Sequence, residues 1–293
     1  MEVRDLGDGV HVFLGPVNLG AIVVEGKALF VDAGLDDGPA RKLYRWAEEN
    51  HLSPHAAVLT HAHADHFGGA FLWANRGLSL YASPLEGAMM EHPILEPIFL
   101  FAGATPPQEL RAKFTLAKPC RIQPIEPGPL ELGPFTVEVI SLPGHAPAQI
   151  GVRFNHVLFC ADALFPEEVL RKHPIPFCHD FDGALESLKV VEGAENLVPG
   201  HGPLLSGDGV RRACNAFRDQ LQKIRDIVHR ELHLPRTGEE LVVRVAEKLG
   251  ANFFGLADFC LAQTTIHAVL TSLSREGLAQ AVVEGNRLLW RRR

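Results

Sequence analysis

The chain has few cysteines, and their spacing excludes a disulfide-based scaffold. Among its 293 residues there are five cysteines, an odd number, and no two of them form a C-x-x-C pair: Cys120, Cys160, Cys178, Cys214 and Cys260. This usage is typical of buried thiols in a reducing compartment. The first residues also lack an apolar stretch of signal-peptide length. We therefore expect a cytoplasmic protein.

Long apolar runs, internal repeats and an excess of positive charge are absent as well. No run approaches the ~18 to 20 apolar residues of a membrane helix, so we expect no membrane partner. The formal net charge of −7 gives no overall attraction to nucleic acid. Hydrophobic residues make up 46% and charged residues 22% of the chain, which is the balance of a folded protein with a substantial core.

The charge is unevenly distributed along the chain. The segment from Arg211 to Arg293 contains 14 basic and 9 acidic residues, a balance of +5, so the preceding part carries −12. The difference in charge is explained either by a solvated helical surface in the C-terminal part or by a division of the chain into two modules of different charge. We predict a catalytic domain over residues 1–207 and a small C-terminal domain over residues 208–293.

Apolar patterning before residue 207 alternates between strands and helices. The segment 84–118, with five prolines, is expected to be irregular, its Phe99-Leu100-Phe101 patch serving either packing or a substrate lid. Amphipathic helices are expected over 37–50, 67–75 and 182–192. Strands are expected over 9–14, 18–25, 27–32, 56–60, 78–82, 121–125, 135–142, 149–154, 156–160 and 195–198. Two strand-rich halves, each followed by a helix, indicate an α+β fold in which two sheets pack together with helices outside.

The C-terminal part has a different pattern. Helices are expected over 210–232 and 256–275, and Thr237 and Glu240 can cap another that runs to about residue 249. Strand patterns on either side of Glu284-Gly285-Asn286 predict a terminal hairpin. Three helices and a hairpin indicate a winged-helix-like unit, which could contact nucleic acid or form a homodimer interface.

The strongest chemical pattern is a histidine cluster that follows the predicted strand 56–60. Within six residues, His61, His63, Asp65 and His66 provide three imidazoles and a carboxylate, which suit zinc and neighbouring divalent metals. In an extended segment, His61 and His63 point to the same side, because side chains alternate. A turn then directs Asp65 and His66 towards a second position.

Three more candidate ligands follow later strand patterns. His145 lies in Pro-Gly-His-Ala-Pro, Asp162 ends an apolar run, and His201 lies in Pro-Gly-His-Gly-Pro. Turn residues on both sides of the histidines would present each ring at a strand edge. Together with the first cluster they provide seven ligands, enough for two adjacent cations.

These residues resemble the metallo-β-lactamase superfamily, especially its glyoxalase-II-like branch of hydrolases, over about residues 10–205. The resemblance implies a four-layer αββα sandwich with the site at one edge between the sheets. The tail resembles the winged-helix-like appendage of one branch. By motif match, the resemblance implies a first metal on His61, His63 and His145, a second on Asp65, His66 and His201, and a bridge by Asp162.

Two positions depart from the pattern of this superfamily. Ala146 follows His145 where many relatives have Thr or Ser, and Ala161 precedes Asp162 where Gly is usual. Neither change removes a ligand, and we expect both to affect the shape of the pocket. Asp162 itself argues against antibiotic hydrolysis, because the exported β-lactamases of the superfamily generally lack the bridging carboxylate. An iron-dependent sulfur dioxygenase of the same fold is an open alternative.

The expected cofactors are two divalent cations, zinc first and iron or manganese as alternatives. The expected reaction is hydrolysis of a small ester, thioester or lactone through a metal-bridging hydroxide, with Asp65 orienting the nucleophile and accepting its proton. The alternative is an endoribonuclease acting on single-stranded RNA, motivated by the basic tail. A third hypothesis is a DNA-binding regulator with a structural metal. A structural zinc site has only four ligands, so the seven candidate ligands of this chain argue against it. His92, His173, His179, Asp180 and Cys160 are secondary candidates for which structural roles are favoured.

Overall fold

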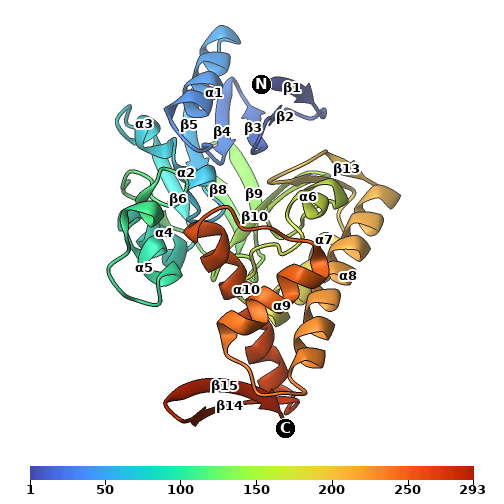
Figure 1. The fold of residues 1–293 in the computed structure, drawn as a ribbon. Helices are drawn as coiled ribbons and strands as arrows, with labels where there is room; N and C mark the ends of the chain where they lie inside the picture. Colours follow the sequence, from blue (N-terminus) through green and yellow to red (C-terminus); the bar gives the residue numbers. More distant parts are fainter.

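Two sheets stacked face to face occupy the centre of the computed structural model, which describes residues 1–293 (Figure 1). In spatial order, the first sheet contains β1 (Glu2–Asp5), β2 (Val10–Leu14), β3 (Leu19–Val24), β4 (Lys27–Val31), β5 (Ser53–Val58), β6 (Ser79–Ala82) and β7 (Gln123–Pro124). The second contains β13 (Leu205–Ser206), β12 (Asn196–Pro199), β11 (Val157–Ala161), β10 (Ile150–Phe154), β9 (Phe135–Ser141) and β8 (Gly128–Leu132).

The first sheet changes from antiparallel to parallel pairing at β4. Strands β1 to β4 form a meander, and β3 and β4 are joined by the two-residue turn Glu25-Gly26, in which both φ angles are positive (49° and 72°). This is the turn geometry that matches strand twist in a tight hairpin. From β4 to β7 the pairing is parallel. The antiparallel opening is therefore confirmed, whereas β1 and β8 are strands that the sequence patterns did not predict.

Three apolar layers connect the sheets and helices. Between the sheets lies a core of 17 buried residues that includes Ile22, Val58 and Val152. The outer face of the first sheet packs on α1 (Asp37–Glu49), α2 (Ala64–Phe67) and α3 (Ala70–Ala74), with Trp73 fully buried. The second sheet is covered by α6 (Glu167–Lys172) and α7 (Phe181–Val191). The predicted αββα order of layers is confirmed.

The segment 84–118 is not irregular, and that expectation is wrong. It contains α4 (Pro84–Glu91), α5 (Leu95–Leu100) and the 3-10 helix η1 (Gln108–Arg111). Pro84 occupies the first turn of α4, where a missing N–H removes no helical hydrogen bond, so this proline starts a helix and does not break one. In the apolar patch, Leu100 is buried, but Phe99 is 60% exposed.

The C-terminal part consists of three helices and a hairpin (Figure 1). They are α8 (Asp208–Glu231), α9 (Gly238–Leu249), α10 (Leu256–Arg275), β14 (Ala279–Glu284) and β15 (Arg287–Arg292). The capping box of α9 is formed as predicted: the Glu240 N–H donates to Thr237 Oγ1 (3.2 Å) and the Thr237 N–H donates to Glu240 Oε2 (2.8 Å). None of the helices combines the length and the apolar character needed to cross a bilayer.

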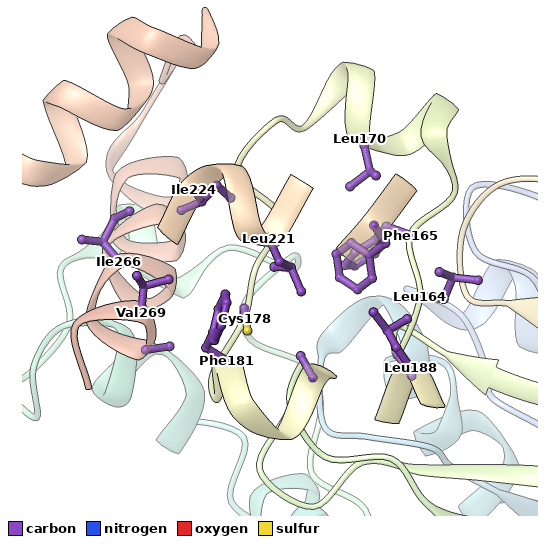
Figure 2. Packing of buried hydrophobic residues seen from close by; sticks show 14 of the residues in the cluster. Leu164, Phe165, Leu170, Cys178, Phe181, Leu188, Leu221, Ile224, Ile266 and Val269 are labelled. Atoms are coloured by element: carbon purple, nitrogen blue, oxygen red, sulfur yellow. The ribbon is translucent and has the colours of Figure 1, made fainter. Parts of the chain in front are cut away.

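The C-terminal helices share a hydrophobic core with the second sheet and its helices. One cluster of 32 buried residues runs from Leu142 and Leu188 to Leu221 on α8 and Ile266 on α10. Figure 2 shows Leu221, Ile224, Ile266 and Val269 packed around Cys178 and Phe181. The apolar faces of α8 and α10 are thus buried within the chain. A domain boundary after residue 207, a winged-helix description and a homodimer all stay predictions.

Candidate metal centre

All seven predicted ligands lie together at one edge of the two sheets, where several strands end. The first cluster follows β5, His145 lies in the loop after β9, Asp162 follows β11, and His201 follows β12. Strand β5 runs parallel to β4, and β11 runs parallel to β12, so their carboxyl ends present loops on the same side. The sheet topology brings together residues up to 140 positions apart in the sequence.

A first group consists of three imidazoles. His63 Nδ1 lies 3.1 Å from His61 Nε2 and 2.8 Å from His145 Nε2. The three nitrogens can act as ligands to one ion, since all lie within 4.8 Å of one another. Three histidine nitrogens directed at a common position are typical of a metal site.

A second group consists of Asp65, His66 and His201, and Asp162 lies between the two groups. Asp65 Oδ2 is 3.3 Å from His201 Nε2. Asp162 Oδ1 is 3.4 Å from His66 Nε2, while Asp162 Oδ2 is 3.4 Å from both His145 Nε2 and His201 Nε2. One carboxylate therefore contacts histidines of both groups, as a bridging ligand would.

The outer nitrogen of each histidine ring also has a polar neighbour. When the outer nitrogen donates a hydrogen bond, the inner nitrogen keeps the lone pair that a metal needs. The neighbours are Thr60 Oγ1 for His61 (3.1 Å), Glu96 Oε1 for His63 (3.6 Å), Asp32 Oδ2 for His66 (2.8 Å), the Phe177 carbonyl for His145 (3.2 Å) and the Pro16 carbonyl for His201 (2.7 Å).

Asp32 is a supporting residue that the sequence patterns did not single out. It follows β4, is 3% exposed, and accepts hydrogen bonds from the Thr60 N–H (2.8 Å) and hydroxyl (2.9 Å) as well as facing His66. Its φ of 59° lies in the left-handed region, which Asp tolerates better than most residues. The pattern that indicated Asp162, an apolar run ending in Asp, is also present in Phe30-Val31-Asp32 and could have identified it.

Two further buried residues connect the loops that carry the candidate ligands. The Glu86 carboxylate on α4 accepts from the Ala62 N–H and the Ala148 N–H, both at 2.8 Å, and so connects the first histidine loop to the loop of His145. The Asn18 amide donates to the carbonyls of Pro199 (2.9 Å) and Gly202 (2.8 Å) on either side of His201. Neither residue stands out in the sequence.

Burial keeps the first three histidines neutral. It lowers the pKa of His63 to about 4 and that of His145 to about 3, and it holds the pKa of His61 well below its usual value. Neutral imidazole is the form that binds a metal ion.

The second group instead favours positive charge. Burial opposes protonation of His201, but Asp162 and Asp65 outweigh it and raise its pKa to about 10. Burial also opposes protonation of His66, yet Asp162 and Asp32 raise its pKa well above the usual value. A location that stabilises protons this strongly would also stabilise a cation.

Two buried polar atoms of the site without hydrogen bonds also fit a metal ion. His66 Nε2 and Asp162 Oδ1 are buried and have no hydrogen-bond partner. Such atoms are costly to leave unsatisfied and rare in folded proteins. A divalent cation with nitrogen and oxygen ligands would satisfy both atoms.

The comparison with protein families agrees with this arrangement. The family model described as the metallo-β-lactamase superfamily matches residues 12–201, more than half of the chain and all seven candidate ligands. The chain belongs to the metallo-β-lactamase superfamily. Among its curated relatives is the "Probable metallo-hydrolase YqgX" of Bacillus subtilis, 26% identical over 224 residues, which cover 71% of this chain and 92% of that protein. The protein is therefore a metallo-hydrolase of this superfamily, with histidine-rich groups of side chains that could hold a metal ion.

Glyoxalase-II-like relatives match a shorter part of the chain. Hydroxyacylglutathione hydrolase 1 of Vibrio vulnificus is 28% identical over 131 residues, 45% of this chain and 42% of that enzyme.

Solved structures of the superfamily share the fold. A β-lactamase domain protein from Burkholderia ambifaria has a TM-score of 0.78 at 20% identity, covering 100% of this chain and 94% of that one. A metallo-β-lactamase family protein from Thermus thermophilus has a TM-score of 0.75 at 21% identity, covering 99% of this chain and 100% of that one. The similarity in fold thus extends over the C-terminal helices.

One departure from the superfamily pattern has a structural consequence. Ala161, where Gly is usual, has a φ of 46°, a left-handed conformation that glycine adopts without steric cost. The chain keeps this conformation with a Cβ present, so the departure leaves Asp162 at the site.

None of the secondary candidates belongs to a group of side chains that could hold a metal ion. His92, His173 and His179 are exposed. Cys160 is fully buried, and burial raises the pKa of its thiol well above the usual value, as expected for a packing residue.

Proposed function

We propose that the protein hydrolyses a small ester, thioester or lactone with two divalent cations, zinc being the first expectation and iron or manganese the alternatives. In this proposal the first cation is held by His61, His63 and His145. The second is held by Asp65, His66 and His201, and Asp162 contacts both.

The observation that carries the proposal is the convergence of the ligand atoms. Three imidazole nitrogens face one position, and the adjoining position contains His66 Nε2 and Asp162 Oδ1, which are buried 3.4 Å apart without a hydrogen bond. A structural zinc site needs four ligands, whereas this set has seven, enough for two ions with positions left for water and substrate.

The chemistry divides between the cations and the chain. When bound, the cations supply Lewis acidity, which lowers the pKa of water towards neutrality and polarises the substrate carbonyl. Asp65 provides a proton acceptor: burial acts to raise its pKa, but His66 and His201 outweigh burial and lower it, so the carboxylate is ionised at neutral pH. Its side chain is 14% exposed, which leaves it accessible from the solvent side.

Apolar walls beside the histidines favour an acyl substrate. The Phe177 ring lies edge-on to His63 and His145, with ring centroids 5.1 and 5.3 Å apart, and the Phe165 ring lies 5.5 Å from His145. The partial likeness to an enzyme named for hydroxyacylglutathione supports a thioester. The RNA alternative has less support, because Arg287 and Arg291 of the tail pair with Glu240 and Glu284 at 3.0 Å.

The test is a mixed substrate panel with a matched pair of variants. Protein loaded with zinc, manganese or iron is assayed on acyl thioesters, activated esters, lactones, phosphodiesters and short single-stranded RNAs. We expect turnover of the carbonyl substrates, a loss of at least about 100-fold in kcat for Asp65→Asn, as is usual when a proton-transfer group is removed, and no change for Asp219→Asn, which alters an exposed carboxylate on α8. RNA cleavage without turnover of any carbonyl substrate would reject the proposal.

The cellular setting is also a proposal. All five cysteines are unpaired and buried, which fits a reducing compartment such as the cytoplasm. A small-molecule partner follows from the proposed reaction. We also propose a homodimer formed through the C-terminal part, and a measurement of the molecular mass in solution tests it.

A further inference from the structure

Helix α10 of the C-terminal part contacts the loop that carries Phe177. Thr265, on this helix, is fully buried. Its hydroxyl donates to the Pro176 carbonyl (2.9 Å) and accepts from the Cys178 N–H (3.1 Å). One side chain thus holds the backbone on both sides of Phe177. Figure 2 shows Cys178 in the core formed with α8 and α10, where Ile266 is the sequence neighbour of Thr265.

Phe177 in turn contacts the first group of histidines. Its carbonyl accepts from His145 Nδ1 at 3.2 Å, and its ring packs on His63 and His145. A carbonyl that accepts from Nδ1 fixes the ring orientation and leaves the Nε2 lone pair free. His145 Nε2 is the atom that lies 2.8 Å from His63 Nδ1.

The loop around Phe177 has few backbone groups with which to anchor itself. Pro174 and Pro176 lack an N–H. The Pro174 carbonyl accepts from the Gln220 side chain on α8, and at the other end the N–H groups of His179 and Asp180 donate to the Gly144 carbonyl at 2.8 and 2.9 Å. Between these two ends, the backbone of residues 176–178 is held by the hydroxyl of Thr265, in addition to the contact between the Phe177 carbonyl and His145.

We propose that Thr265 is a positioning residue for metal binding, which acts through the Phe177 carbonyl on His145 and so makes the C-terminal helices part of the metal site. This inference rests on the proposed function, in which His145 is a ligand. Residues that orient metal-bound histidines change metal affinity by about 10- to 100-fold. Thr265 acts on the His145 ring indirectly, through the backbone of Phe177, so we expect its effect to be at the lower end of that range.

The experiment measures zinc affinity by competition with a chelator, in full-length protein. Thr265→Val keeps the shape of the side chain but removes its hydrogen bonds to Pro176 and Cys178, along with a 3.4 Å contact to the Leu261 carbonyl of its own helix, whereas Thr265→Ser keeps the hydroxyl. Thr264→Val is the matched control, because the neighbouring hydroxyl bonds only to the Cys260 carbonyl of its own helix (3.1 Å). We expect about a 10-fold loss of affinity for Thr265→Val, recovery to within about 3-fold for Thr265→Ser, and no change for Thr264→Val.

Two further measurements separate positioning from a general loss of stability. In a His145→Ala background, Thr265→Val is expected to have no additional effect on zinc affinity, because its route to the metal is already absent. The absorption spectrum of the cobalt-substituted protein, which reports ligand geometry, is expected to change in Thr265→Val and not in Thr264→Val. If Thr265→Val does not fold, Thr265→Cys, with a weaker hydrogen-bonding group of similar size, replaces it.

The possible failures are distinguishable. A lower melting temperature of Thr265→Val with unchanged zinc affinity and cobalt spectrum overturns the inference, and so does an undiminished effect in the His145→Ala background. If His145→Ala itself leaves zinc affinity unchanged, the ligand assignment of the proposed function fails, and this inference fails with it.

Discussion

His66 Nδ1 lies 2.8 Å from Asp32 Oδ2, and both side chains are almost completely buried. The contact joins the end of β4 to the histidine cluster after β5. With a cation bound, this contact would keep the proton of His66 on Nδ1 and leave the Nε2 lone pair for the metal. The same carboxylate accepts from Thr60, whose hydroxyl faces His61 Nδ1, so Asp32 is linked to a histidine of each ligand group.

We expect Asp32→Asn to lower the affinity for divalent metal by about 10- to 100-fold, the usual effect of removing an outer carboxylate partner of a metal-bound histidine. Asn is the same size and tolerates the left-handed φ at this position, so folding should be retained. Chelator competition measures the affinity, and circular dichroism checks the fold. Asp219→Asn is the control, and equal affinities for both variants would remove Asp32 from the site.

Gly200 precedes His201, and a substitution at this position tests how closely the candidate site is packed. A Cβ at Gly200 would lie 2.1 Å from Asp162 Oδ1 and 2.8 Å from His66 Cε1. Since both neighbours are buried side chains of the proposed ligand set, Gly200→Ala should displace them and lower the affinity for metal by at least about 10-fold without removing a proposed ligand. Gly193→Ala is the matched control, because its nearest contact would be an ordinary 3.6 Å. Metal analysis after dialysis decides the outcome.

Glu86 should make stability depend on pH. Burial raises its pKa from 4.5 to about 6, against the opposing effect of the N–H groups of Ala148 and Ala62. Because the pKa is raised on folding, the stabilising contribution is fully present below about pH 4.5 and is lost as the pH rises through 6. The expected change is about 2 kcal/mol, from 1.36 kcal/mol per pKa unit.

The measurement compares urea unfolding of the metal-free wild type and Glu86→Gln from pH 4.5 to 7. The stability difference, wild type minus variant, should fall by about 2 kcal/mol as the pH rises, since Gln does not titrate in this range. A difference that stays constant with pH would contradict the raised pKa of Glu86.

Metal removal should lower the melting temperature, because His66 Nε2 and Asp162 Oδ1, which are buried without a hydrogen bond, would lose the cation that satisfies them. At free zinc 100-fold above its dissociation constant, bound metal adds about 2.7 kcal/mol of stability per site. Differential scanning calorimetry with and without chelator measures this loss, and added zinc should restore it. An unchanged melting temperature would argue against a buried metal site.

The types of residue and their spacing in the sequence made much of the candidate site predictable. The cluster from His61 to His66 is dense enough to indicate metal binding, and His145, Asp162 and His201 each follow an apolar run bounded by turn residues. The same periodicities located most strands and the three C-terminal helices. The helices α4 and α5 were missed because their prolines resemble breaks in the sequence, although Pro84 begins a helix.

The supporting contacts could not be predicted, because each joins residues that are distant in sequence and ordinary in type. Glu86 connects two loops 86 residues apart, from Ala62 to Ala148, and Thr265 contacts a segment 87 to 89 positions earlier. The sequence by itself determined which side chains can bind a metal and where strands present them. Only the tertiary structure decided which neighbours orient those side chains, because a hydrogen bond depends on ångström-scale placement, which the packing of the whole fold sets.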